Sequence, residues 1–140
     1  MLFRSLFEDN RLSGHVQLVH GAVGQRSGTA VIRDDRHAST IIGASGEGGA
    51  AGAQVPYVDL SPLFAEVTSI DLLKCDIEGS EQLFIEQYPD LLQKVRVAVF
   101  EFHRDRCDVE RCQALLRDYG FSNEAMLRRG EADFTLVVWR

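Results

Sequence analysis

The segment 70–77 constrains the fold of this chain most strongly. It is mostly apolar, ends in the polar turn Glu78-Gly79, and is followed by a stretch with helical spacing of apolar residues. A short apolar run that closes on such a turn is typical of a strand buried within a parallel sheet. We therefore expect 70–77 to be a central parallel strand, with a helix beginning at about Ser80.

The patterns after this strand predict an alternation of helices and strands. Pro89 ends the first helix and begins a shorter one through Leu92. Residues 95–102 are β-branched and aromatic, which predicts a second buried strand. Asp108 is a suitable N-cap and Gly120 a suitable C-cap for the next helix.

Before residue 70 the predicted elements are shorter. Apolar residues at helical spacing predict a helix over 1–10, and alternation between two glycines predicts a strand over 15–20. Residues 29–32 and 55–58 are further strand candidates. Ser61 and Pro62 have the residue types of a helix start.

Strands that alternate with helices predict a single α/β domain over 1–140, with a mostly parallel sheet and helices on both faces. The end of the chain departs from this pattern. Residues 125–127 and 134–139 flank a turn around Gly130, so we expect a C-terminal antiparallel hairpin at one edge of the sheet.

The composition excludes several classes of function. A net charge of -6 argues against nucleic acid as a partner, because such binding depends on basic side chains. No apolar run is long enough to span a membrane, and no signal peptide opens the chain. The three cysteines form no C-x-x-C pair and lack metal-ligand spacing with the histidines. We expect a cytoplasmic protein without disulfides or a metal site.

The segment 43–54 is rich in glycine and alanine and predicts a flexible surface loop. Within it, residues 46–51 match the dinucleotide-binding pattern G-x-G-x-x-A. Such a turn must follow a buried strand and open a helix, and no helical pattern follows here. The flexible loop is therefore the favoured interpretation.

Polar residues follow both predicted buried strands. Asp76 and Glu78 end one, and Glu101 and His103 end the other. Ligands of open α/β sheets bind beyond the carboxyl ends of the strands, where carboxylates and a histidine can orient a hydroxyl or take its proton. Alternatively, the carboxylates serve only the following helix N-terminus, and Lys74 pairs with an acid such as Glu101.

Residues 70–81, Ile-Asp-Leu-Leu-Lys-Cys-Asp-Ile-Glu-Gly-Ser-Glu, resemble the signature of the FkbM family of S-adenosylmethionine-dependent methyltransferases. The similarity continues in order on both sides. Residues 6–10 resemble the end of the helix before the family's third core strand, and 16–24 resemble that strand and its turn. Residues 55–60 and 97–103 resemble the approach to the signature and the next core strand.

The resemblance implies a Rossmann-like methyltransferase fold that transfers a methyl group from S-adenosylmethionine to a hydroxyl of a small molecule or sugar. It places Asp76 at the junction of cofactor and substrate, and Gly21 and Ala22 near the adenine. Glu78 and His103 become candidate catalytic residues on the substrate side, together with Asp76.

The resemblance also aligns the chain with the C-terminal portion of the family, after the glycine-rich turn of the first strand and the acid that holds the ribose. With those N-terminal strands missing, we expect an exposed edge along 70–77, which residues 16–19 or a second copy of the chain would cover. The alternative function is a non-catalytic α/β module for binding or assembly.

Overall fold

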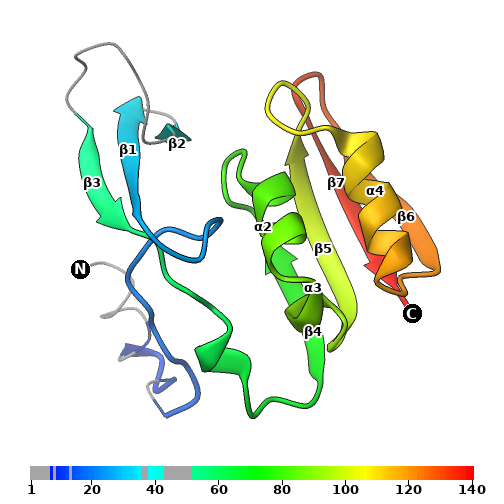
Figure 1. Ribbon diagram of the computed structural model, residues 1–140, viewed down its shortest axis with the longest axis horizontal. Helices are drawn as coiled ribbons and strands as arrows, with labels where there is room; N and C mark the ends of the chain where they lie inside the picture. The colour runs from blue at the N-terminus through cyan, green and yellow to red at the C-terminus, as the bar shows by residue number, and fades with distance from the viewer. Residues whose placement is uncertain (1–6, 8, 13, 36–37, 43–51) are drawn as a thin grey trace.

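The computed structural model describes residues 7, 9–12, 14–35, 38–42 and 52–140. These residues form a mixed α/β structure with two separate sheets (Figure 1). A three-stranded sheet lies on the left of that view. A four-stranded sheet with its helices lies on the right.

The smaller sheet is entirely antiparallel. It consists of β1 (Thr29–Asp35), β2 (Ala38–Ile42) and β3 (Ala53–Pro56), in the order β2-β1-β3. The strand predicted at 29–32 is confirmed as part of β1, whereas the one predicted at 55–58 begins and ends two residues earlier, as β3. The sequence patterns did not predict β2.

The predicted strand at 15–20 is wrong. Residues 16–20 take part in no described strand, and Leu18 and Val19 are 44% and 48% exposed. Alternation of apolar residues produces a strand only when a neighbouring strand supplies hydrogen bonds, and none of the described strands does so here. Most of the predicted helix at 1–10, and residues 43–51 of the predicted loop, lie outside the described residues.

The larger sheet carries the core of the molecule. Its strands are β4 (Ile70–Cys75), β5 (Val95–His103), β6 (Asn123–Arg129) and β7 (Asp133–Trp139), in the order β4-β5-β7-β6. Only β4 and β5 run parallel among the described strands; β7 lies antiparallel between β5 and β6.

Two predictions about this sheet are therefore wrong. The sheet is not mostly parallel, because the C-terminal hairpin inserts β7 directly beside β5. Nor is β4 a central strand: within the described residues it lies at the edge, and Leu72 is 62% exposed. Residues 16–19, which belong to no described strand, do not cover this edge.

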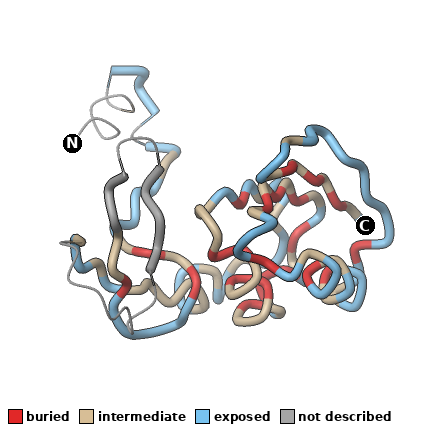
Figure 2. The backbone as a smooth tube through the Cα atoms, turned by 90° about the horizontal axis from the view of Figure 1, so that it is seen from above, coloured by how far each residue is buried: buried red, intermediate tan, exposed pale blue. Residues whose placement is uncertain are grey.

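The helices of this part are α2 (Glu81–Gln87), α3 (Pro89–Leu92) and α4 (Val109–Asp118), and one 3-10 turn, η1 (Pro62–Phe64), precedes β4. Figures 1 and 2 place α2, α3 and α4 on the same face of the sheet, so helices on both faces are not found in the described part of the chain. Figure 2 shows the buried residues concentrated between these helices and the sheet.

Local signals at the helix ends act as the sequence predicts. Pro89 starts α3, and the Asp108 side chain accepts a hydrogen bond from the Arg111 N–H at the start of α4. Gly120 follows α4 with a φ of 98°, a conformation that glycine adopts without steric penalty. Among the described helices, none has the length and apolar character that crossing a bilayer requires.

Hydrogen bonds attach the N-terminal segment to the end of α2. Arg26 donates from Nε and Nη2 to the Gln87 carbonyl, and its guanidinium lies 5.0 Å from the centre of the Tyr88 ring. The buried Tyr88 hydroxyl donates to the Val58 carbonyl at 3.2 Å. These contacts fix the course of the chain between the two sheets.

Candidate functional site

The turn between β4 and α2 has an unusual backbone. Glu78 and Gly79 both have positive φ, at 55° and 99°. Two consecutive left-handed residues reverse the chain sharply, and a glutamate rarely adopts this conformation. Strained backbone of this kind concentrates at functional sites, which makes this turn a candidate for one.

Glu81, the first residue of α2, holds this turn together. Its side chain has no exposed surface. Oε1 accepts hydrogen bonds from the N–H groups of Ile77 and Gly79, both at 3.1 Å, and Oε2 accepts one from the Cys107 thiol at 3.3 Å. A buried carboxylate is stable only when such hydrogen bonds replace its hydration.

His103 ends β5 and lies between two carboxylates. Its Nδ1 is 3.4 Å from Oε1 of Glu81, and its Nε2 is 3.5 Å from Oε2 of Glu78. The imidazole is mostly buried, and Nδ1 lies close to Glu81 without the angle of a full hydrogen bond. Each ring nitrogen of His103 therefore faces a carboxylate oxygen.

The loop after β5 fastens this arrangement. Arg106 donates from Nη1 to the Glu78 carbonyl at 2.9 Å, and the Cys107 N–H donates to the His103 carbonyl at 3.0 Å. A Cβ atom on Gly79 would collide with the Arg106 side chain, so only glycine allows the two loops to approach this closely.

Asp76 and Glu101 belong to a different group of side chains. Asp76 forms an ion pair with Lys74 at 2.8 Å, and this hydrogen bond raises the pKa of Lys74. Glu101 pairs with Arg128 at 3.4 Å. Lys74 thus pairs with a nearby acid, as the alternative predicts, but this acid is Asp76 and not Glu101. The alternative that Asp76 caps the next helix is wrong, because its described hydrogen bond is with Lys74.

The structure therefore divides the predicted site. It brings Glu78 and His103 together with Glu81, while the described contacts of Asp76 are with Lys74. Glu81 was missed as a site residue because an acid in the first turn of a helix is common and shows nothing unusual in sequence. Its place in the resemblance, as the last residue of the signature, was the available signal.

Gly21 and Ala22 lie beside the segment that follows β3. Ala22 is buried; its N–H donates to the Pro56 carbonyl and its carbonyl accepts from the Val58 N–H. No described contact joins these two residues to His103. Gly24 is closer to the β4–α2 turn, since a Cβ there would lie 3.6 Å from Ser80.

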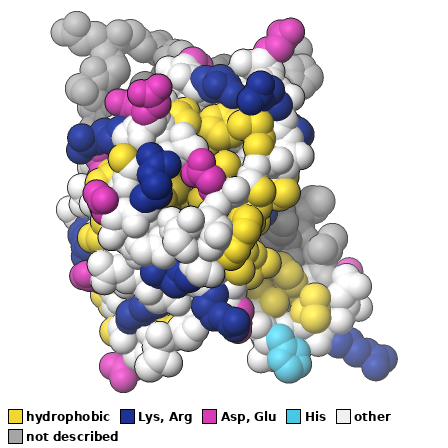
Figure 3. Space-filling model, turned by 90° about the vertical axis from the view of Figure 1, so that its right-hand side faces the viewer, with side chains coloured by type: hydrophobic (Ala, Val, Ile, Leu, Met, Phe, Trp, Pro, Cys, Tyr) yellow, Lys and Arg dark blue, Asp and Glu magenta, His cyan; other side chains and the backbone are white. Residues whose placement is uncertain are grey.

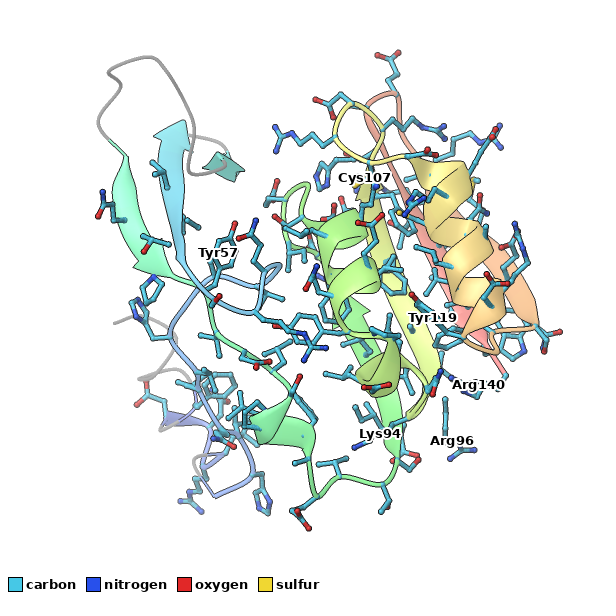
Figure 4. The ribbon with its side chains drawn as sticks, in the orientation of Figure 1. Tyr57, Lys94, Arg96, Cys107, Tyr119 and Arg140 are labelled. Atoms are coloured by element: carbon cyan, nitrogen blue, oxygen red, sulfur yellow. The ribbon has the colours of Figure 1, made fainter. Side chains whose placement is uncertain are left out.

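The thiols near the site are not nucleophiles at neutral pH. Burial raises the pKa of Cys107 to about 11 and that of Cys75 well above its ordinary value. Figure 4 shows Cys107 at the same end of the sheet as the β4–α2 turn, with Lys94 and Arg96 at the opposite end. Cys107 therefore acts here as a hydrogen-bond donor to Glu81.

A search against protein families matches residues 8–122 to the methyltransferase FkbM domain. The matched region contains the β4–α2 turn and the end of β5, and so Glu78, Glu81 and His103. Comparisons with curated proteins and with solved structures give no match.

Proposed function

Because the chain belongs to the FkbM methyltransferase family, we propose that it transfers a methyl group from S-adenosylmethionine to a hydroxyl of a small molecule or sugar. One observation carries the proposal: His103 lies between Glu78 and Glu81 at the carboxyl end of β5. Open α/β sheets bind their ligands at this end of the strands.

In this proposal His103 is the base. Glu81 is buried and fixed by backbone N–H groups, so it holds the Nδ1 side of the ring and leaves Nε2 for the acceptor hydroxyl. Nε2 would take the hydroxyl proton as the acceptor oxygen bonds to the methyl carbon and the bond between that carbon and sulfur breaks, which leaves S-adenosylhomocysteine. Glu78, 3.5 Å from Nε2, stabilises the positive charge that the ring gains.

The acidic side chains of this region fit the charge of the proposed cofactor. S-adenosylmethionine, when bound, supplies an electrophilic methyl group on a positively charged sulfur. Asp76 and Glu78 follow β4 and carry negative charge at the end of the sheet where that cation would bind. Ala22 is buried and its backbone groups are already hydrogen-bonded, so it has little surface and no free backbone group to offer the adenine.

The three buried, free cysteines support a cytoplasmic location as part of this proposal, because a reducing compartment keeps thiols unpaired.

A direct test combines binding with turnover. The chain is titrated with S-adenosylmethionine by calorimetry and then incubated with a panel of sugars and small hydroxylated molecules, while S-adenosylhomocysteine formation is followed. Micromolar binding and acceptor-dependent product support the proposal. Absence of both binding and product would contradict the proposal.

The second candidate, a non-catalytic α/β module for assembly, is favoured by the exposed edge of β4, where Leu72 is 62% exposed. It predicts self-association with no heat of binding for S-adenosylmethionine. The titration above separates the two candidates, because only the enzyme requires the cofactor.

A further inference from the structure

A cavity of about 480 Å³ adjoins the candidate site on the helix side of the sheet. Residues of α4, of the β6–β7 hairpin and of the loop after β5 line it. Arg104 and Arg129 contribute positive charge, and Met126 and Phe134 contribute apolar surface. Figure 3 shows basic side chains beside an apolar patch at the upper end of the molecule, where Figure 1 places these loops.

The two arginines of this cavity form no ion pair with any side chain that the structure describes. The guanidinium of Arg104 lies over the Phe134 ring, 4.6 Å from its centre. Arg129 donates from Nε to the Met126 sulfur, a weak acceptor, at 3.3 Å. By contrast, Arg128 next to them forms ion pairs with Asp133 and Glu101.

This lack of partners is notable because acids outnumber bases in the chain, which has a net charge of -6. Acidic residues lie nearby, yet the Asp108 carboxylate, which lines the same cavity, caps α4 instead. A guanidinium that is stacked on a ring and free of carboxylates keeps its donors available for a planar anion.

The cavity adjoins the loop that follows His103. Arg104 follows His103 in the chain, and Cys107, which lines the cavity, donates to Glu81 at 3.3 Å. A molecule bound there would therefore contact Cys107, whose thiol is hydrogen-bonded to the carboxylate beside the imidazole.

We infer that Arg104 and Arg129 bind an oxyanion, a carboxylate or a phosphate, carried by the methyl acceptor. Phe134 and Met126 pack against the carbon skeleton of this acceptor, and Glu110 on the same wall faces its hydroxyl groups. That the anion belongs to a methyl acceptor rests on the proposed function. The anion site itself rests on the cavity and the two arginines.

The experiment follows the Nε–Hε NMR signals of the arginine side chains in the full chain, without S-adenosylmethionine. Inorganic phosphate, acetate and the neutral sugar glucose are titrated separately. We expect saturable shifts of the Arg104 and Arg129 signals with at least one anion and no such shifts with glucose. Phosphate alone would identify a phosphate-bearing acceptor, and acetate alone a carboxylate.

Variants then assign the binding. The double variant Arg104→Gln/Arg129→Gln should weaken anion binding about tenfold or more, because each change removes charge-assisted hydrogen bonds. Arg117→Gln is the matched control, since Arg117 lies on α4 and pairs with Glu124. It should bind the anion like the wild type.

The inference would be overturned if the Arg104 and Arg129 signals of the wild-type chain showed no saturable shift with either anion, whatever the variants do. Equal shifts with glucose, or unchanged affinity in a folded double variant, would also overturn it. Anion binding in a chain that neither binds S-adenosylmethionine nor forms product would remove the proposed function and leave the anion site.

Discussion

Glu81 Oε1 lies 3.4 Å from His103 Nδ1, and the same oxygen accepts hydrogen bonds from the N–H groups of Ile77 and Gly79. One buried carboxylate thus fixes the turn after β4 and lies against the ring at the end of β5. The two strands are parallel neighbours, so this contact joins their carboxyl ends.

Glu81→Gln tests this double role. In glutamine only one of the two side-chain atoms that replace the carboxylate oxygens can accept hydrogen bonds. If it accepts from the two backbone N–H groups, the NH₂ group faces the Cys107 thiol, and a buried polar group is left unsatisfied. We expect a loss of about 1–3 kcal/mol in the free energy of unfolding, measured with urea. Glu124→Gln is the control, because Glu124 is exposed, and its stability should stay close to that of the wild type.

Local sequence patterns do not predict the role of Glu81, and only its place as the last residue of the family signature indicates it. Its burial depends on α4 and the loop after β5, which approach from more than twenty positions away and supply Cys107. Helical periodicity places Glu81 only in the first turn of α2. The left-handed backbone of Glu78 could not be predicted either, because the residue type that indicates this conformation is glycine.

Gly79→Ala tests the close approach of the two loops. A Cβ would meet the Arg106 side chain, and the φ of 99° disfavours any L-residue. We expect a loss of about 1–2 kcal/mol in unfolding free energy from the backbone conformation alone. Gly14→Ala, where a Cβ would meet nothing within 4 Å, should not lower the stability. Equal stabilities for both variants would contradict the described turn.

Alkaline pH should destabilise the fold through its thiols. Burial raises the pKa of Cys107 to about 11 and of Cys112 to about 12, from an ordinary value of 9.0. The unfolded chain therefore releases these protons first, so their stabilising contribution is complete below pH 9 and is lost as the pH rises toward the folded-state values.

The measurement is the free energy of unfolding in urea between pH 8 and about 10.5. Each thiol steepens the decline by at most about 1.4 kcal/mol per pH unit. Cys112→Ala should decline less steeply than the wild type, whatever its stability at pH 8. An identical slope in the variant would show that Cys112 titrates normally.

The exposed edge of β4 leads us to propose a homodimer with antiparallel pairing of two β4 strands. In such a dimer a twofold axis through Leu72 places this residue opposite Leu72 of the second copy. Asp71 and Lys74 then do not lie opposite their own counterparts, so like charges do not face each other. Leu72→Glu brings two like charges together and should shift the protein toward monomer in analytical ultracentrifugation.

Leu127 on β6 provides the control for this prediction. It is also 62% exposed, but β6 has an irregular register between Met126 and Arg128, and charged side chains follow. Such features protect an edge strand from pairing. Leu127→Glu should therefore leave the association unchanged, and a wild-type chain that is monomeric at all concentrations would remove the proposal.

The fold was predictable where the signals were local. Pro89, Asp108 and Gly120 mark the ends of α3 and α4, and the structure confirms all three. The order of strands was not predictable, because no local pattern says that β7 lies between β5 and β6. For the same reason the alternation at 15–20 was misleading.

The most direct test of the central claim is the rate of methyl transfer by His103→Gln at saturating S-adenosylmethionine. The account predicts a rate at least about a hundredfold lower, as expected for loss of a general base, with cofactor affinity preserved. His15→Gln, a change at an exposed histidine, should keep the wild-type rate. A His103→Gln enzyme that transfers methyl groups at the wild-type rate would contradict the account.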